Sequence, residues 1–221
     1  MEQRPESLRT LAVDPKGLAV ARLGRKLLRH LLRPWNSSLI TRPIDRMRFL
    51  RFGKGATLER PAYITGASAI AVGPRAQISA YSRIVAFLPE PGVVRIDIGA
   101  RALISPWVHI SAAELVKIGD DVAVGSFSWI TDHDHDISDP TCGVDTHRRI
   151  VVSPTILEDR VYIGERVSVL RGVRIGEGSI VGANSVVIRD IPPYCIAVGA
   201  PARVVKRFDL DRRVWVRVSD K

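Results

Sequence analysis

The sequence has few of the features that support several common classes of protein. Only two cysteines, Cys142 and Cys195, occur in 221 residues, so a disulfide-stabilised secreted fold is not expected. No apolar run approaches the ~20 residues that a transmembrane helix needs. The N-terminus lacks the apolar segment and small-residue cleavage site of a secretory signal. These absences favour a cytoplasmic protein in a reducing environment.

Motifs for nucleic-acid binding are also lacking, although the net charge is +10. There is no Cys/His finger, no aromatic strand signature and no glycine-bracketed RNA-binding loop. The cations are concentrated in residues 22–60 and again from Arg203 to Lys221. We therefore expect no nucleic-acid partner, and the positive charge points instead to anionic lipid or a phosphorylated ligand.

Aliphatic residues at every sixth position form the strongest pattern in the sequence. An amphipathic helix has a period of about 3.6 residues and a two-faced strand a period of about 2, so neither produces this spacing. It is expected when each hexad forms one short strand and a corner, three hexads complete a triangular turn, and the turns stack as parallel strands. The inward positions predicted in this way are Leu58, Ile64, Ile70, Val72, Ile78, Ile84, Ile98, Ile104, Ile110, Ile118, Val124, Ile130, Val151, Leu157, Ile163, Val169, Ile175, Val181 and Val187.

Two further positions of the hexad are restricted in type. Glycine follows the aliphatic residue at Gly164, Gly176 and Gly182, and small or β-branched residues come four positions after it, from Thr155 to Ser185. Glycine adopts dihedral angles that other residues avoid, which suits a tight corner. The pattern therefore predicts an all-β prism filled by aliphatic side chains.

The hexad pattern is interrupted twice, and function is expected at the interruptions. Residues 131–150 lack the inward aliphatic series and must project from the coil, as long functional loops do. Residues 87–95, FLPEPGVVR, contain two prolines and a glycine, which a stacked strand does not accept. This second stretch is predicted to be a loop, which either frames a cleft together with the first interruption or forms a simple surface turn.

The first interruption opens with ITDHDHDISD, residues 130–139, which contains two histidines and four aspartates. A histidine can remove a proton from a hydroxyl near neutral pH and release it again, and one of Asp132, Asp134 or Asp136 can orient the imidazole. A metal site is the alternative, because Cys142 and His147 follow closely. No CxxC or HExxH motif supports it.

An N-terminal segment, GLAVARLGRKLLRHLLR at residues 17–33, combines leucines with cations and ends before Pro34. It is predicted to be a basic amphipathic helix. Such a helix packs on the rest of the protein or on a sister subunit, or it lies on an anionic membrane surface. Both roles are consistent with its composition.

Two stretches resemble the hexapeptide-repeat acyltransferase family, in particular its sugar O-acetyltransferase branch. They are VKIGDDVAVGSFSWITDHDHDI at residues 116–137 and LEDRVYIGERVSVLRGVRIGEGSIVGANSVVIRDIPPYCIAVGAPARVVKRF at residues 157–208, whose ending AVGAPARVVK is the most specific part. The resemblance implies a left-handed parallel β-helix with an extruded loop, and a short N-terminal helical segment outside the likeness. The expected domains are residues 1–52, a basic segment; 53–206, the β-helix; and 207–221, a basic tail.

The resemblance also implies site residues. His135 matches the family's general base best, with His133 as the rival. Asp134, one of the three aspartates that can orient the imidazole, is taken with them as a candidate catalytic residue. Acetyl-coenzyme A is the implied acyl donor, with no metal. Its implied contacts are Tyr162, Gly164, Ala183, Ile188, Arg189, Arg203 and Lys206. The galactoside-type enzymes hold the sugar with Asn and Asp residues one coil before the histidine, and this sequence departs from them there. Trp107, His109 and Glu114 are the candidate acceptor contacts in their place, and the alternative for Trp107 and His109 is that they cap the coil.

The function implied is transfer of an acetyl group to a hydroxyl of a sugar, a polysaccharide or a lipid-linked precursor, by a cytoplasmic homotrimer with active sites between subunits. Peripheral membrane contact through residues 17–33 is compatible with a lipid-linked acceptor. The alternatives are a zinc enzyme resembling the γ-class carbonic anhydrases, which share this fold, and a non-catalytic β-helix binding module.

Overall fold

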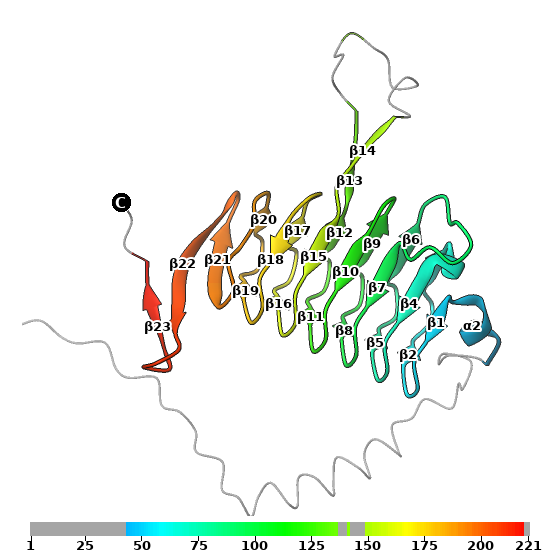
Figure 1. Ribbon diagram of the computed structural model, residues 1–221, viewed down its shortest axis with the longest axis horizontal. Helices are drawn as coiled ribbons and strands as arrows, with labels where there is room; N and C mark the ends of the chain where they lie inside the picture. The colour runs from blue at the N-terminus through cyan, green and yellow to red at the C-terminus, as the bar shows by residue number, and fades with distance from the viewer. Residues whose placement is uncertain (1–42, 137–140, 142–148, 219–221) are drawn as a thin grey trace, which may run out of the picture. The chain divides into compact units, whose positions relative to one another are not determined.

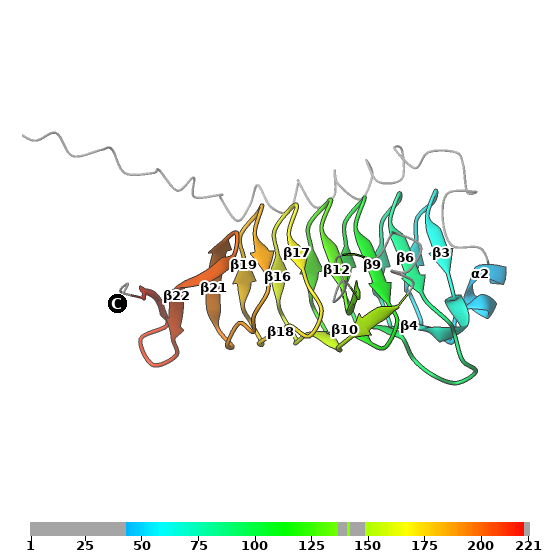
Figure 2. The same cartoon turned by 90° about the horizontal axis from the view of Figure 1, so that it is seen from above.

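The protein is described from a computed structural model that defines residues 43–136, 141 and 149–218, all within a unit that spans residues 38–221. In this unit, consecutive strands pass in turn through three sheets whose coil strands run parallel. The backbone therefore winds into a three-sided prism, seen from two directions in Figures 1 and 2. This is the left-handed parallel β-helix that the hexad pattern and the resemblance predict.

The three faces of the prism are named here sheets 1, 2 and 3. Sheet 1 contains, in spatial order, β1 (Arg51–Phe52), β4 (Ile70–Val72), β7 (Ile96–Ile98), β10 (Val116–Ile118), β15 (Thr155–Leu157) and β18 (Arg174–Ile175). Sheet 2 contains β2 (Thr57–Leu58), β5 (Gln77–Ile78), β8 (Leu103–Ile104), β11 (Ala123–Val124), β16 (Tyr162–Ile163), β19 (Ile180–Val181), β21 (Cys195–Gly199), β22 (Ala202–Asp209) and β23 (Val214–Arg217). Sheet 3 contains β3 (Tyr63–Thr65), β6 (Arg83–Ala86), β9 (His109–Ala112), β12 (Trp129–Thr131), β17 (Ser168–Val169) and β20 (Val186–Val187).

The ends of the described prism are closed by elements that leave the hexad pattern. At the N-terminal end, helix α2 (Pro43–Arg48) precedes β1, and Phe49 is buried with its ring edge-on to that of Phe52. A short 3-10 helix, η2 (Ala67–Ala69), leads into β4. At the C-terminal end, β21, β22 and β23 pair antiparallel. Residues 207–217, expected from the sequence to lie in a tail, thus include the end of β22 and all of β23.

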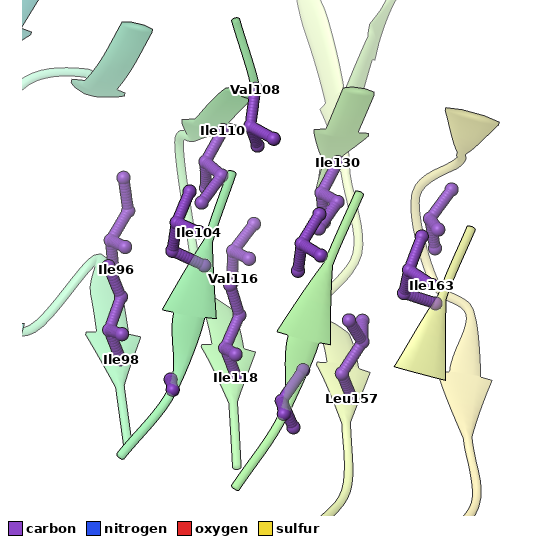
Figure 3. Close-up of a cluster of buried hydrophobic side chains, with 14 of the residues drawn as sticks. Ile96, Ile98, Ile104, Val108, Ile110, Val116, Ile118, Ile130, Leu157 and Ile163 are labelled. Carbon is purple, nitrogen blue, oxygen red and sulfur yellow. The ribbon is translucent and has the colours of Figure 1, made fainter. Parts of the chain in front are cut away.

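The prism is filled by the side chains that the hexad pattern selects. The inward isoleucines of successive coils lie in register along the axis (Figure 3), and residues such as Ile104 and Ile163 are fully buried. The small or β-branched position is buried too, from Thr155 to Ser185. Each full burial of a side chain of this size contributes about 1.5–3 kcal/mol to stability. Ile64 is the weakest of the upstream inward positions, since it is only partly buried against the core.

The prediction of Val151 as an inward residue is wrong. Val151 lies in β14 (Ile150–Val152), which pairs antiparallel with β13 (His133–His135) in a separate two-stranded sheet. Its side chain is 40% exposed, because this hairpin projects from the stacked coils (Figure 1) and no neighbouring coil covers it. The inward series resumes instead with Thr155 and Leu157.

The glycines of the hexad are required by close approach rather than by unusual dihedral angles. A Cβ atom on Gly164 would lie 2.7 Å from the backbone nitrogen of Ala183 in the next coil. Gly164 has no positive φ, whereas the bulky Trp107 at another corner does, with φ of 65°. Stacked coils therefore meet at the glycine corner with no space for a side chain. No helix of the described residues is long and apolar enough to span a membrane.

Candidate active site

The aspartate- and histidine-rich stretch begins where β12 ends on sheet 3. The chain then leaves the prism as β13 and returns as β14, with His133 opposite Val152 and His135 opposite Ile150. Residues 137–140 and 142–148 lie outside the described part of the chain. The prediction that this segment projects from the β-helix is confirmed by the hairpin (Figure 1).

Asp132 is fully buried at the foot of this hairpin, and its carboxylate is held by three groups. The backbone N–H of Ala113 donates to both carboxylate oxygens at 2.9 and 3.1 Å, and that of Glu114 donates at 2.7 Å. The third group is Nδ1 of His133, 2.8 Å from Oδ1 of Asp132. A buried carboxylate with these partners is fixed in one orientation.

This arrangement determines the tautomer of His133. An ionised carboxylate only accepts hydrogen bonds, so Nδ1 of His133 carries the proton that lies toward Asp132. The hydroxyl of Thr131, with its oxygen 3.1 Å from the same nitrogen, adds a second contact. In the neutral ring Nε2 is then unprotonated and able to accept a proton. The side chain of His133 is 15% exposed, so the ring is largely shielded from solvent.

His135 lies in a different environment. It is exposed on β13, two residues beyond His133. Between them, Asp134 forms an ion pair with Arg171 at 2.7 Å, with both side chains substantially exposed. Asp134 is therefore engaged by Arg171 at the surface, while the buried carboxylate that contacts an imidazole belongs to Asp132. The sequence raised Asp132 as one of three orienting candidates and offered no criterion to prefer it.

His133 also contacts the second interruption of the hexad pattern, residues 87–95, and the residue involved was not identified from the sequence. The ring of Phe87, the first residue of the 87–95 loop, lies edge-on to His133 with centroids 5.0 Å apart. Phe87, Ala113 and His133 each come three residues after an inward isoleucine, Ile84, Ile110 or Ile130. The small Ala113 stands between the two rings in coil order. Equal spacing from the inward position is therefore the signal that identifies this neighbour.

The three candidate acceptor contacts, Glu114, His109 and Trp107, lie at different places relative to the Asp132–His133 pair. Glu114 reaches the site through its backbone N–H. His109 lies on the outer face of β9, with its ring stacked parallel to Trp129 at 5.7 Å. Burial lowers the pKa of His109, and the positive charges of Arg83 and His133 lower it further. Trp107 lies at the corner between sheets 2 and 3, stacked against Tyr81 at 4.3 Å.

Several of the candidate coenzyme A contacts follow one row across sheet 2. Tyr162 is opposite Ile180, which is opposite Ile196, which is opposite Lys206. At about 4.8 Å per strand, this row extends about 14 Å from Tyr162 to Lys206.

Other candidate coenzyme A contacts lie near this row or on a different side. Gly164 and Ala183 meet in adjacent coils just beyond Tyr162, and Arg203 is on the same strand as Lys206. Ile188 and Arg189 instead follow β20 on sheet 3. The candidate contacts are thus divided between two sides of the prism.

The candidate metal ligands are only partly described. Cys142 and His147 lie outside the described residues. Within the described ranges no group of three or more His, Cys, Asp or Glu side chains is arranged to hold a metal ion. His133, one of the candidates, has its Nδ1 directed at Asp132.

Comparison with known proteins supports the fold and the family. Residues 154–189 match the family described as bacterial transferase hexapeptide (six repeats). WbbJ of Escherichia coli K12, provisionally named a lipopolysaccharide biosynthesis O-acetyl transferase, is 37% identical over 119 residues, which are 51% of this chain and 60% of WbbJ. Rv3034c of Mycobacterium tuberculosis, provisionally named an acetyltransferase, is 43% identical over 95 residues, 43% of this chain and 31% of Rv3034c.

Two solved structures show the same fold. A mutant of AntD, an N-acyltransferase from Bacillus cereus in complex with dTDP and coenzyme A, has a TM-score of 0.67 at 21% identity, covering 79% of this chain and 93% of AntD. The hexapeptide-repeat acetyltransferase VCA0836 of Vibrio cholerae, complexed with acetyl-coenzyme A, has a TM-score of 0.56 at 22% identity, covering 88% of this chain and 90% of VCA0836. This chain is similar to the hexapeptide-repeat transferase family over residues 154–189 and to WbbJ over about half of its length. It spans less than two thirds of the length of WbbJ and of Rv3034c.

Proposed function

We propose that this protein is an acetyl-coenzyme A-dependent O-acetyltransferase that modifies a hydroxyl of a sugar or saccharide. The observation that carries the proposal is the imidazole of His133, oriented by a buried carboxylate at the foot of a projecting hairpin. The name of WbbJ supports an oxygen acceptor and a role in polysaccharide biosynthesis. The complexes of AntD and VCA0836 support a coenzyme A thioester as donor.

We assign the general base to His133 in place of His135, which the family resemblance favoured. Nε2 of His133 accepts the proton of the acceptor hydroxyl while the hydroxyl oxygen forms a bond to the thioester carbonyl carbon. A backbone N–H stabilises the oxyanion of the tetrahedral intermediate. The carbon–sulfur bond then breaks, and His133 returns the proton to the thiolate of coenzyme A. No acyl-enzyme is required, because the donor is already activated.

Asp132 acts as the positioning residue in this mechanism. It keeps the proton of neutral His133 on Nδ1, and its negative charge stabilises the imidazolium that forms when Nε2 is protonated. Two backbone N–H groups hold the carboxylate in place, so no reorganisation is needed during the reaction.

We also propose that the protein is a homotrimer with each active site between two copies. Tyr162 and Lys206 lie on sheet 2, whereas His133 lies beside sheet 3. The faces of a three-sided prism look in different directions, so one extended ligand does not lie against both faces of a single chain. Three copies with parallel axes around a three-fold axis place sheet 2 of one copy opposite sheet 3 of the next, in a closed heterologous ring.

The test of the proposed function is acetyl transfer by the purified full-length chain. With acetyl-coenzyme A labelled in the acetyl group and a panel of saccharides, we expect label in a saccharide ester, with release of free coenzyme A in equal amount. Stoichiometric zinc in the purified protein without transfer would favour the metalloenzyme alternative. Absence of transfer together with no rise in Tm on addition of coenzyme A would favour the binding module, because a ligand of the folded state raises apparent stability.

A further inference from the structure

The outer surface of sheet 3 carries a second group of functional side chains beside His133. Arg83 of β6 is in register with His109 of β9, and His109 with Trp129 of β12. Arg83 is the first residue of β6 and Phe87 directly follows its last residue, and both side chains are exposed. Because the ring of Phe87 contacts His133, the row from Arg83 to Trp129 runs beside the candidate base.

Arg83 gives this surface a permanent positive charge. The guanidinium of the exposed Arg83 lies 5.1 Å from the ring centroid of Tyr63, a cation–π contact. No described carboxylate forms an ion pair with it. Arg83 and His133 are both close enough to His109 for their charges to lower its pKa. The carboxylate of Asp132 is already occupied by His133 and two backbone N–H groups.

The geometry points to an anion-binding subsite in which Arg83 and His109 hold a phosphate or carboxylate group of the saccharide acceptor. Arg83 presents a planar set of donors suited to such groups, and His109 adds a ring N–H. Trp129, partly exposed beside His109, presents an apolar surface to the sugar. Four residues along a strand cover about 13 Å and neighbouring strands lie about 4.8 Å apart. His109 on β9 is therefore about 14 Å from the base beside β12, a length that two sugar rings ending in an anionic group can bridge.

This inference rests on the proposed function and names the substrate class: an acidic or phosphorylated saccharide rather than a neutral glycoside. It also accounts for part of the positive charge without nucleic acid. The subsite lies on the same prism face as His133, so the base and the anion contact come from one chain. The coenzyme A contacts on sheet 2 are not part of it.

The subsite is tested by binding, independently of turnover. Inorganic phosphate is titrated into the full-length protein with ¹³C-labelled histidine rings, and the His109 resonance is assigned with a His109→Gln variant. We expect a saturable shift of that resonance, and a Kd about tenfold or more weaker in Arg83→Gln, as for loss of a charged hydrogen bond. Arg75→Gln is the matched control, because Arg75 is also exposed but lies at the corner between sheets 1 and 2.

Glucuronic acid and methyl glucoside in place of phosphate separate carboxylate recognition from non-specific sugar binding. A shift with phosphate alone identifies a phosphate subsite, and a shift with glucuronic acid as well identifies a general anion subsite. A shift with methyl glucoside that has the same Kd as the shift with glucuronic acid contradicts the inference. An identical phosphate Kd in Arg83→Gln and the unmodified protein also overturns it.

Measurements of acetyl transfer distinguish failure of the anion-binding subsite from failure of the proposed acetyltransferase function. If phosphate binds at Arg83 and no saccharide is acetylated, the subsite stands and the acetyltransferase proposal fails. If anionic and neutral saccharides are acetylated with equal kcat/KM, and Arg83→Gln changes neither, the acetyltransferase proposal stands and the subsite fails. For a correct subsite, Arg83→Gln raises KM for the anionic acceptor about tenfold and leaves KM for acetyl-coenzyme A unchanged.

Discussion

Replacement of His133 by alanine is expected to lower kcat for acetyl transfer by about 10²- to 10⁴-fold, the usual contribution of a positioned general base. The side chain is partly exposed and outside the hydrophobic core, so the β-helix should remain folded. An unchanged far-ultraviolet circular dichroism spectrum and a Tm within a few degrees of the original provide the check on folding. KM for acetyl-coenzyme A should change little, because the role assigned to His133 is in proton transfer.

His135→Ala is the matched control, since it removes the same side chain two residues further along β13. We expect it to retain kcat within about threefold, because the orienting contact with a buried carboxylate belongs to His133; an effect of that size corresponds to less than about 1 kcal/mol. If His135→Ala is inactive and His133→Ala is active, the base assignment returns to His135. Equal activity of both variants and the unmodified protein would exclude either histidine as the base.

Asp132→Asn is expected to have the second largest effect. The side-chain oxygen of the asparagine would still accept from Ala113 or Glu114, which directs its NH₂ group toward Nδ1 of His133. The neutral ring would then carry its proton on Nε2, where it cannot accept another. We expect kcat to fall about 10²-fold or more, and the free energy of unfolding to fall by about 1–3 kcal/mol, because the buried hydrogen bonds lose the ionised acceptor that strengthens them.

Asp134→Asn is the control for this effect. Asp134 has a side chain that is 49% exposed and pairs with Arg171 at the surface, and such pairs contribute about 0–1 kcal/mol. Near-normal kcat is therefore expected. Loss of activity in Asp134→Asn with retention in Asp132→Asn would show that Asp134 is the orienting carboxylate.

The prism could be predicted from the sequence because its constraint repeats. Each inward residue such as Ile104 or Ile163 occupies the same place in a hexad and becomes fully buried. A pattern repeated in many coils is visible even if single positions fail. Val151 is a position at which the prediction fails. It is aliphatic and stands six residues before Leu157, but it lies in the hairpin, where every sixth residue does not point inward.

The candidate site was less predictable because its contacts join residues of different coils. Asp132, Asp134 and Asp136 have the same chemistry in the sequence. Only the fold shows that Asp132 turns inward below the N–H groups of Ala113 and Glu114, in the coil before it. From the sequence, His135 was preferred to His133 because of its likeness to the family pattern. The properties that favour His133, its burial and the orientation of its Nδ1 toward Asp132, appear only in the three-dimensional structure.

Some residues that lie together in the site could have been identified from the sequence by aligning its coils. Phe87 and His133 stand at the same distance from an inward isoleucine, and aligning the coils on that residue places them in one row. The same alignment places Arg83, His109 and Trp129 in a second row. Alignment also places the small Ala113 between Phe87 and His133, but the edge-on contact of the two rings depends on their side-chain conformations, which the sequence does not show.

The most direct test of the account is a crystal structure of the full-length protein with coenzyme A. We expect the thiol sulfur about 3–4 Å from Nε2 of His133, the range of hydrogen bonding and of reacting atoms, with the pantetheine arm against Tyr162 of the partner subunit. A thiol bound beside His135, or one more than about 8 Å from His133 with the protein in its assembled state, would place the chemistry elsewhere, since reacting groups must approach to near contact.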